Sequence, residues 1–563
     1  MNNKKIIVIG GSAAGPKAAA KARRLDEFAE ITMFQKGNDL SMASCGYPYY
    51  VGGTFNDRNM LLTTPAGIVR DPKFYWNAKG IVAKNNTEVT KINRANKTVE
   101  FTDLKTGDKA SQEYDKLIIA TGATANIPPI KGIDLEGITT LQSMQDADFL
   151  RKVRDEKKIK KAVVIGGGLI GIETLEALHL AGIKLTLIEL LPQLLTFLDF
   201  SLAKLVENYL KTKANVITNN GVAEFIGENG HLTAVKLKNG TEIDCELAVI
   251  AIGVRPNVKL AKDCGIAIGE IGGIKVNDFM QTNDPDIFAV GDCIEIKNLI
   301  TNKSVHAPYG DLANLQGRVA GENAIEGNVS SFKGTIQTGI CKFFDYAAGT
   351  TGISQSKAKE AGFNYQTVIN ASPDKPGFMN GKMLITELII DKDNQRILGA
   401  QCFGPGDVSK QIAIWASAIQ GKLTVEDMIN SDFPYAPPFS LAIDHSIATA
   451  HVMQNKLKGR FVGITSLELN EKITRNDKVF LLDVRNPDEY EQTRLGLGEI
   501  LIPLGALRNR LSQLPEDKTT EIVTYCKISL RGYEAAIILK AHGFTNVKVL
   551  EGGLSAWIFN KEK

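Results

Sequence analysis

Two cysteines stand in surroundings that would let a thiolate react. Cys45 lies between Ser44 and Gly46, and these small, turn-forming neighbours leave its sulfur accessible. A lone cysteine is more often a small buried hydrophobe, and the next cysteine along the chain is Cys245. If Cys45 does redox chemistry, its partner sulfur therefore comes from a small thiol or from a distant cysteine.

The second cysteine, Cys526, ends a β-branched run and opens a short loop that leads through Arg531 into a predicted helix. The N–H groups and the dipole at a helix N-terminus favour an anion, and Arg531 could complete a ring of donors. The alternative is a core cysteine at a strand end. The loop favours the reactive interpretation.

A glycine-rich turn, Gly10–Gly15, separates the predicted strand Lys5–Ile9 from a helix predicted over Pro16–Leu25. Such a turn brings backbone N–H groups and the helix N-terminus to a pyrophosphate. Ser12 replaces the middle glycine, and the next predicted strand ends in Gln35, a neutral acceptor in place of an acid. An ordinary βα turn is the alternative, but the order of the elements favours a nucleotide site.

A second turn, Gly166–Gly171, has the complete dinucleotide fingerprint between the predicted strand Lys161–Ile165 and a helix. Glu189 ends the following strand, where a carboxylate accepts from a ribose 2′-hydroxyl and repels a 2′-phosphate. No arginine follows in Leu190–Gln193. The sequence therefore predicts a preference for NADH over NADPH.

Three further strand ends contain polar or glycine residues: Thr121-Gly122, Gly253 and Gly291-Asp292. Gly291 would let a ligand approach the backbone, and Asp292 could accept from a polyol. A structural turn is the alternative. We expect Gly291 and Asp292 to contact the first nucleotide.

Lys17, Lys21 and Arg24 are spaced to share one face of the first predicted helix. Such a stripe is usually only solvated. Because it begins beside a predicted phosphate site and near Cys45, it is also a candidate site for the phosphates of a thiol substrate.

The overall composition narrows the class of protein. A chain of 563 residues is too long for one core, and a net charge of +3 gives no indication of a nucleic-acid partner. The seven cysteines lack the spacing of a zinc site or a secreted disulfide framework, so we expect no metal and a reducing cytoplasm. We also expect no signal peptide and no membrane span.

Residues 1 to about 452 resemble the flavin- and NAD(P)-dependent disulfide reductases, and among them the single-cysteine coenzyme A disulfide and persulfide reductases. The motifs that carry this resemblance occur in the family's order: the first glycine turn, Ala120-Thr121-Gly122, Gly166–Gly171, Ala289–Asp292 and Tyr435–Pro438. Residues 463–563 resemble a rhodanese domain through Asp483-Val484-Arg485, the Cys526 loop and Glu551–Trp557.

The resemblance implies an α/β protein with two Rossmann-like nucleotide-binding domains in a glutathione-reductase-like arrangement, an α+β dimerisation domain and a C-terminal α/β rhodanese domain. We expect the FAD-binding domain at 1–115 and 255–330 and the NAD(P)H-binding domain at 116–254. The dimerisation domain is expected at 331–452, a linker at 453–462 and the rhodanese domain at 463–563.

The resemblance also implies FAD, NAD(P)H, a coenzyme A thiol and a homodimer in which Tyr435 reaches the partner's active site. The residues expected at the cofactors are Gly10, Gly11, Ser12, Ala13, Ala14, Gly15, Gln35, Lys36, Ser44, Val89, Ala120, Thr121, Gly122, Gly166, Gly168, Ile170, Gly171, Glu189, Gly253, Gly291 and Asp292. Ser41 is expected at the substrate with Lys17, Lys21 and Arg24, and catalysis is expected of Cys45, Cys526, Tyr435 and Arg531.

The chain departs from the family's pattern at several positions. Asp374-Lys375 stands where a tyrosine pair is usual before Pro-Gly, Ile443 replaces a lysine, and Ser44 replaces the asparagine before the cysteine. Ser529 replaces a common glycine in the rhodanese loop. These changes bear on the coenzyme A pocket more than on the flavin chemistry.

The expected function is NADH-dependent reduction of coenzyme A persulfide, polysulfide or coenzyme A disulfide through Cys45, with the rhodanese domain handling sulfane sulfur. One alternative is an NADH oxidase or peroxidase that cycles the cysteine through sulfenic acid. Those relatives have a histidine in the first glycine turn, where this chain has Ala13. A second alternative is a non-catalytic sulfur carrier or redox-sensing flavoprotein.

Overall fold

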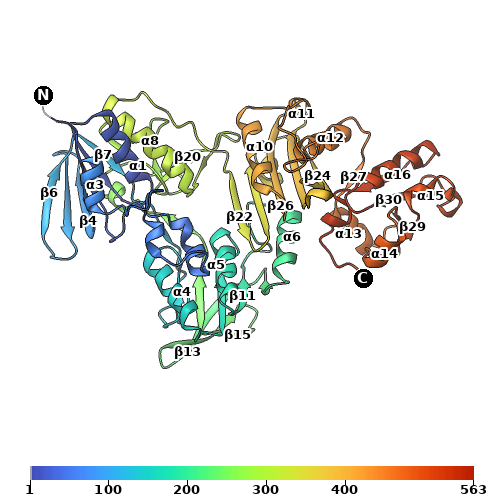
Figure 1. Ribbon diagram of the computed structural model, residues 1–563, viewed down its shortest axis with the longest axis horizontal. Helices are drawn as coiled ribbons and strands as arrows, with labels where there is room; N and C mark the ends of the chain where they lie inside the picture. Colours follow the sequence, from blue (N-terminus) through green and yellow to red (C-terminus); the bar gives the residue numbers. More distant parts are fainter. Residues whose placement is uncertain (1–2) are drawn as a thin grey trace. The chain divides into compact units, whose positions relative to one another are not determined.

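The computed structural model describes residues 3–563, and the chain forms two compact units (Figure 1). The first unit contains the chain up to Leu190 and then Ile217–Thr335. The second contains Leu191–Val216 and Ile336–Lys563.

The first unit opens with a parallel sheet in the order β19-β7-β1-β2-β3. Its strands are β1 (Lys5–Ile9), β2 (Glu30–Phe34), β3 (Ile81–Lys84), β7 (Lys116–Ile119) and β19 (Ile287–Ala289). The β1 side chains from Ile6 to Ile9 are all buried, which is expected for a parallel sheet that helices cover on both faces. The predicted strand–turn–helix order is therefore confirmed here.

Helices α1 (Ala14–Leu25) and α8 (Gly310–Glu326) pack closely beside this sheet. A β-carbon on Gly317 would lie 2.4 Å from the Ala14 carbonyl oxygen, and one on Gly321 would lie 2.3 Å from that of Ala18. The two glycines let the helix backbones approach, and this fixes the N-terminus of α8 relative to the first glycine turn.

A second parallel sheet contains β11 (Lys184–Ile188), β10 (Lys161–Ile165), β16 (Leu247–Ile250) and β9 (Ile138–Thr139) in that order. Helix α5 (Leu169–Leu180) follows β10 directly, and α4 (Met144–Glu156) precedes it. Helix α4 begins with a capping box in which Ser143 and Asp146 satisfy each other's backbone N–H groups.

The remaining elements of the first unit are small sheets and short helices. Two antiparallel sheets are formed by β4 (Thr87–Asn93), β5 (Thr98–Asp103) and β6 (Lys109–Glu113), and by β13 (Val222–Glu228), β14 (His231–Leu237) and β15 (Glu242–Asp244). Shorter strands are β8 (Ala123–Ala125), β17 (Val254–Pro256), β18 (Ile274–Lys275), β20 (Ile294–Lys297) and β21 (Ser304–Val305). The short helices are α2 (Tyr47–Gly52), α3 (Pro72–Lys79) and α7 (Lys259–Asp263).

The second unit contains an antiparallel sheet in the order β22-β23-β26-β25-β24. Its strands are β22 (Gly339–Phe343), β23 (Tyr346–Gly352), β24 (Tyr365–Pro373), β25 (Met383–Asp391) and β26 (Ile397–Gly404). The helices around it are α6 (Phe200–Leu210), α9 (Gln355–Glu360), α10 (Val408–Gln420), α11 (Val425–Ile429) and α12 (His445–Leu457).

The second unit also contains a parallel sheet in the order β27-β31-β30-β28-β29. Its strands are β27 (Gly463–Ile464), β28 (Val479–Asp483), β29 (Ile500–Leu501), β30 (Glu521–Tyr525) and β31 (Val547–Leu550). The connecting helices are α13 (Ser466–Thr474), α14 (Pro487–Gln492), α15 (Leu504–Leu507) and α16 (Leu530–Ala541), and the short 3₁₀ helix η5 (Gly553–Ala556) follows β31.

The segment expected as a linker, 453–462, begins as a helix: α12 continues to Leu457, and its residue Met453 is buried. Polar residues over 454–458 are compatible with the exposed side of a helix, which is why composition alone did not separate helix from linker. Among residues 3–563, none of the helices has the length and apolar character needed to cross a membrane.

Candidate functional site

The first glycine turn has no room for side chains where it joins β1 to α1. A β-carbon on Gly10, whose φ is +113°, would lie 1.9 Å from the Ala120 carbonyl oxygen. A β-carbon on Gly15 would lie 1.9 Å from the Gly10 carbonyl oxygen. The missing side chains leave backbone N–H groups and the N-terminus of α1 accessible to a phosphate.

Gln35, just after β2, accepts a hydrogen bond from the Gly11 N–H at 2.8 Å through its Oε1. The backbone N–H of Ser41 donates to the Gly11 carbonyl oxygen at 2.7 Å. The turn is therefore held from two sides, and the acceptor at its edge is a neutral amide.

The second glycine turn is built in the same way between β10 and α5. A β-carbon on Gly166 would lie 2.3 Å from the Ala251 carbonyl oxygen, and one on Gly171 would lie 1.9 Å from that of Gly166. Here the acceptor is a carboxylate, because Glu189 Oε2 accepts from the Gly167 N–H at 2.7 Å. Both turns thus fit a dinucleotide, and they differ in the charge of the residue expected at the ribose.

The other residues expected at the cofactors lie mostly around these two turns. Ser12 is exposed, Ala13 is the residue before α1, and Ala14 is buried. Thr121 donates to the Asn257 carbonyl oxygen at 2.7 Å. Gly122 and Gly253 have φ values of +67° and +88°, which favour glycine.

The remaining expected residues are two near the first turn, Lys36 and Val89, and two within the second turn, Gly168 and Ile170. Lys36 forms an ion pair with Glu88 at 2.9 Å on the surface, and Val89 is buried in β4. Gly168 is the exposed residue before α5, and Ile170 in its first turn is 41% exposed. The Lys36 and Val89 side chains thus face an ion-pair partner and the protein core respectively.

Cys45 lies in the 3₁₀ turn Ser44–Gly46 and is the only exposed cysteine among residues 3–563. A β-carbon on Gly310 would lie 3.7 Å from its sulfur. Gly310 is the first residue of α8, so the sulfur stands at the N-terminus of a long helix, where partial positive charge favours a thiolate.

The negative charges around Cys45 oppose the effect of the α8 N-terminus on the thiol pKa. Burial of part of the residue raises the pKa of the Cys45 thiol, and the carboxylates of Glu173, Asp292 and Asp311 raise it further. The thiolate of Cys45 therefore depends on the N-terminus of α8 for stabilisation. Protonation of the nearby carboxylates would also favour the thiolate, because it removes their negative charge.

Glu173 is a site residue whose role sequence reasoning did not identify. It lies in the first turns of α5, where burial raises its pKa to about 7, and the Tyr49 hydroxyl donates to its Oε1 at 3.4 Å. An acid with this pKa exchanges protons near neutral pH. The sequence feature that could have identified Glu173 is its position two residues after the dinucleotide fingerprint Gly166–Gly171.

Gly291 and Asp292 follow β19. The Gly291 N–H donates to the Oε1 of Gln316 in α8 at 2.8 Å, and His306 Nε2 lies 2.8 Å from the Asp292 carbonyl oxygen. Burial raises the pKa of the Asp292 carboxyl. Its side chain is half-buried and no hydrogen bond to it is found within residues 3–563, so it remains able to accept from a ligand hydroxyl.

The basic stripe on α1 is partly engaged within the protein. Lys21 forms an ion pair with Glu322 of α8 at 3.2 Å, and both side chains are largely buried. Lys17 is half-buried against Gly317, whereas Arg24 is exposed. Ser41 adopts φ +50°, and its carbonyl oxygen accepts from Arg70 at 3.0 Å.

Cys526 directly follows β30 and is buried. Its loop includes Ser529, which has a φ of +85° that is unusual for a residue with a side chain. The Ser529 hydroxyl donates to the Leu550 carbonyl oxygen at 3.0 Å. This hydrogen bond helps the loop keep a shape that glycine would adopt without strain.

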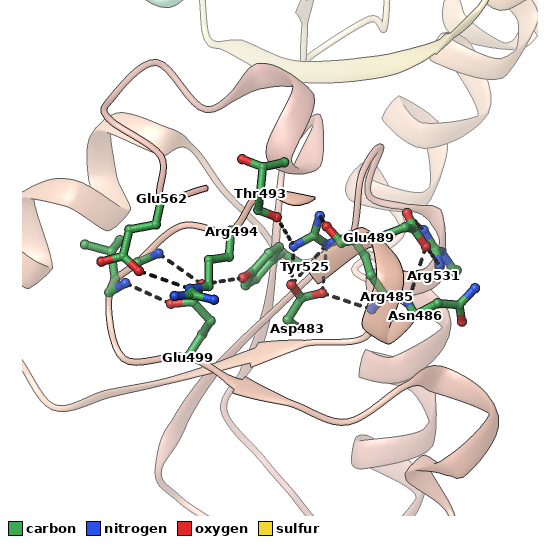
Figure 2. Close-up of polar contacts among 12 residues, drawn as sticks. Asp483, Arg485, Asn486, Glu489, Thr493, Arg494, Glu499, Tyr525, Arg531 and Glu562 are labelled. Atoms are coloured by element: carbon green, nitrogen blue, oxygen red, sulfur yellow. Dashed lines mark hydrogen bonds and ion pairs between the residues drawn. The ribbon is translucent and has the colours of Figure 1, made fainter. Parts of the chain in front are cut away.

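Arg531 interacts with Cys526 and is held by an ion pair with Glu489. Figure 2 shows this pair beside that of Arg485 with Asp483. Arg531 donates two hydrogen bonds to Glu489, at 2.7 and 2.8 Å. The Glu489 carbonyl oxygen in turn accepts from Arg485, which is buried and paired with Asp483 at 2.6 Å. Glu489, and secondarily Cys526, raises the pKa of Arg531, so the guanidinium remains charged.

Tyr435 lies in the segment between α11 and α12 and is 56% exposed. Other apolar side chains of the same unit are also exposed, among them Phe378, Phe439 and Ile443. The described residues contain no group of three or more His, Cys, Asp or Glu side chains that could hold a metal ion.

Comparisons with known proteins cover nearly the whole chain. Residues 4–308 match the pyridine nucleotide-disulphide oxidoreductase family, residues 338–447 match the dimerisation domain of that family, and residues 465–560 match the rhodanese-like domain. A NAD-dependent persulfide reductase from A. fulgidus superposes with a TM-score of 0.93 at 41% identity, covering 98% of this chain and all of that chain.

Two further relatives align with about four fifths of the chain. The NAD(P)H coenzyme A polysulfide/persulfide reductase of Pyrococcus horikoshii is 32% identical over 80% of this chain and 98% of the relative. An NADH oxidase of Methanocaldococcus jannaschii is 30% identical over 81% of this chain and all of the relative. The flavoprotein part is thus shared by proteins named for two different reactions.

Proposed function

Since the chain belongs to the pyridine nucleotide-disulphide oxidoreductase family, we propose that it is an NADH-dependent reductase of coenzyme A persulfide, polysulfide or coenzyme A disulfide. Proteins of this family bind FAD and NAD(P)H. We assign the FAD to the first glycine turn and NADH to the second, because neither turn has room for side chains and both end beside an acceptor. A bound FAD would supply the transfer of an electron pair from NADH to a sulfur–sulfur bond.

The observation that carries the proposal is the position of Cys45. It is the one exposed cysteine of the described chain, it stands at the N-terminus of α8, and α8 packs against the helix that follows the first glycine turn. A thiolate there can attack a sulfane sulfur and hold it as a persulfide or mixed disulfide.

The net reaction on coenzyme A persulfide balances without a further reactant. One NADH and one proton convert the persulfide into coenzyme A thiol, hydrogen sulfide and NAD⁺. We assign proton exchange near the sulfur to Glu173, because its pKa of about 7 allows it to hold or release a proton at neutral pH.

We propose that Cys526 accepts or relays sulfane sulfur in the rhodanese-like domain. Arg531 supplies a fixed positive charge beside that thiol, and the pairing with Glu489 holds the guanidinium in place. The cysteine is buried in the described structure, so the donor must be a small molecule or a slender thiol.

We further propose a homodimer formed through the dimerisation domain. The exposed side chains of Tyr435, Phe439 and Ile443 offer apolar surface that a second copy would cover. The seven cysteines are all free thiols, which fits a reducing compartment, and we place the protein in the cytoplasm on that ground.

We assign residues 1–115 and 255–330 to FAD binding, 116–254 to NAD(P)H binding, 331–452 to dimerisation and 463–563 to the rhodanese domain. The test is steady-state NADH oxidation with coenzyme A persulfide, polysulfide, coenzyme A disulfide, oxygen and peroxide as separate acceptors. A kcat/KM that is highest for a sulfur acceptor supports the proposal. A kcat/KM that is highest for oxygen or peroxide would identify an oxidase or peroxidase instead, and flavin reduction without turnover would identify a carrier or sensor.

A further inference from the structure

Glu551 is an acid of the rhodanese-like domain that lies almost entirely out of solvent, with 1% of its side chain exposed. Its Oε2 accepts from the backbone N–H of Ile369 in the edge strand β24 at 2.9 Å. Its Oε1 forms an ion pair with Lys456 of α12. Ile369 belongs to the dimerisation sheet and Lys456 to the C-terminal end of α12, which packs on that sheet, so one carboxylate joins the rhodanese-like domain to both elements.

Lys456 binds a second acceptor besides Glu551. Its ammonium donates to the Thr367 carbonyl oxygen at 2.8 Å in addition to Glu551, and its side chain is 17% exposed. Burial raises the pKa of Glu551 even though Lys456 acts in the opposite direction. Such a pair is costly to bury, and removing one partner leaves the other charge uncompensated.

The residues that follow Glu551 support the Cys526 loop. The Leu554 N–H donates to the Cys526 carbonyl oxygen at 2.9 Å, and the Ser555 N–H donates to that of Lys527 at 3.0 Å. A β-carbon on Gly553, whose φ is +58°, would lie 2.4 Å from the Cys526 carbonyl oxygen. The loop therefore rests directly on the segment Gly552–Ser555.

The same segment touches the dimerisation sheet. A β-carbon on Gly552 would lie 3.0 Å from the Ile369 side chain, and the Asn208 side chain of α6 donates to the Ile558 carbonyl oxygen at 2.8 Å. One short stretch thus contacts β24 and α6 on one side and the Cys526 loop on the other. Movement of that stretch would displace the sulfur of Cys526.

We propose that Glu551 is a positioning residue for Cys526: by binding Lys456 and the Ile369 N–H it fixes the segment that supports the Cys526 loop. This inference rests on the proposed role of Cys526 in sulfur transfer. Sulfur transfer then depends on docking of the rhodanese-like domain against β24 and α12, whereas reduction at Cys45 does not.

The reaction for the test is transfer from thiosulfate to cyanide in the full-length holoenzyme. The Cys526 thiolate attacks the outer sulfur of thiosulfate, so that a cysteine persulfide forms and sulfite leaves. Cyanide then takes the outer sulfur as thiocyanate and regenerates the thiolate. No oxidant or reductant is needed, so the assay is independent of NADH.

The variants are Glu551→Ala, Glu551→Gln and Lys456→Met. Glu551→Gln keeps an acceptor for the Ile369 N–H, whereas alanine removes it. The matched control is Lys472→Met, because Lys472 pairs with Glu521 at 2.9 Å in the same domain, at the end of β30 remote from Cys526. NADH oxidation with polysulfide reports folding and flavin loading in each variant.

We expect Glu551→Ala and Lys456→Met to lower kcat for sulfur transfer roughly tenfold to a hundredfold, as small misplacements of a reacting group do. The KM for thiosulfate should change less, and the rate of Cys526 alkylation by iodoacetamide should change with kcat. Glu551→Gln should lower kcat about as much as Lys456→Met does, because its single amide oxygen cannot accept from both the Ile369 N–H and the Lys456 ammonium. Lys472→Met should match the parent. NADH–polysulfide activity should be unchanged throughout.

Parent kcat and parent alkylation rates in both Glu551→Ala and Lys456→Met would overturn the inference, and so would parent values in Glu551→Gln. If Glu551→Ala does not fold, Lys456→Met decides the question from outside the rhodanese-like domain. Cys526→Ser separates the two proposals. Sulfur transfer that survives Cys526→Ser removes the role of Cys526 itself, whereas transfer lost in Cys526→Ser but kept in the other variants removes only the positioning role.

Discussion

Replacing Glu189 with glutamine tests how the second nucleotide site selects its coenzyme. The Glu189 carboxylate accepts from the Gly167 N–H at 2.7 Å, and Gln35 makes the equivalent contact to Gly11 at 2.8 Å in the first site. An amide at this position therefore keeps the contact that holds the turn. Glu189→Gln removes the charge and replaces the second carboxylate oxygen by an NH2 group, which can still form a neutral hydrogen bond to a ribose hydroxyl.

The size of the effect follows from the hydrogen bond to the ribose. A hydrogen bond to a charged group contributes about 1.5–3 kcal/mol and a neutral one about 0.5–1.5 kcal/mol. The difference of roughly 1–2 kcal/mol corresponds to NADH binding about 5- to 30-fold weaker in the variant. Binding of NADPH should become tighter, because the carboxylate no longer repels the 2′-phosphate.

The assay is stopped-flow reduction of the flavin over a range of NADH and NADPH concentrations. The apparent Kd for NADH should rise in Glu189→Gln, and the limiting rate of reduction should stay near that of the parent. Glu242→Gln serves as the control, because Glu242 is an exposed carboxylate of β15 in the same domain. Faster reduction of the parent by NADPH, or an unchanged NADH-to-NADPH ratio in the variant, would refute the reasoning.

Three further predictions concern the substrate site, a buried acid and a strained residue. Replacing Lys21 and Arg24 with alanine should raise the KM for coenzyme A persulfide in a salt-dependent way and leave the KM for polysulfide unchanged; equal changes for both substrates would identify the stripe as a structural or solvated face. Because burial raises the pKa of Glu173 to about 7, the neutral acid stabilises the fold at low pH, and this stabilisation is lost as the pH rises through 7. Glu173→Gln should therefore match the parent Tm at pH 4, below the ordinary pKa of a glutamate, and exceed it at pH 8; equal values at pH 8 would contradict that sign. Ser529→Ala keeps the strained φ of +85° and loses the hydroxyl hydrogen bond, so it should be less stable than Ser529→Gly by about 1 kcal/mol or more in urea unfolding; the reverse order would contradict the strain argument.

The local features of the site could be predicted from the sequence because each depends on neighbours in the chain. Glycines between a β-branched strand and a helix predicted both nucleotide turns, and the strand ends at Gln35 and Glu189 predicted the two acceptors. The small residues around Cys45 predicted its exposure. In each case a few adjacent residues decide the backbone geometry.

The contacts that tune the site could not be predicted in the same way. The Cys45 sulfur lies beside Gly310 of α8, and Glu173 affects it from α5, so these pairs are set by tertiary packing. The pairing of Lys456 with Glu551 joins residues of two domains. Nothing in the local sequence of either partner specifies the other.

The extent of α12 was not predicted for a related reason. The mostly polar residues over 454–460 indicated a linker, but Met453 is buried and Lys456 forms a buried ion pair. A polar helix end packed by tertiary contacts resembles a linker in composition. The distinction depends on partners distant in the sequence.

The most direct test of the account compares Cys45→Ser and Cys526→Ser in two assays, NADH oxidation with coenzyme A persulfide and sulfur transfer from thiosulfate to cyanide. The account predicts that Cys45→Ser abolishes NADH-dependent reduction and retains sulfur transfer. Cys526→Ser should lose sulfur transfer and retain flavin reduction by NADH with some turnover on small sulfur acceptors. A Cys45→Ser enzyme that reduces persulfide at the parent rate would contradict the central claim.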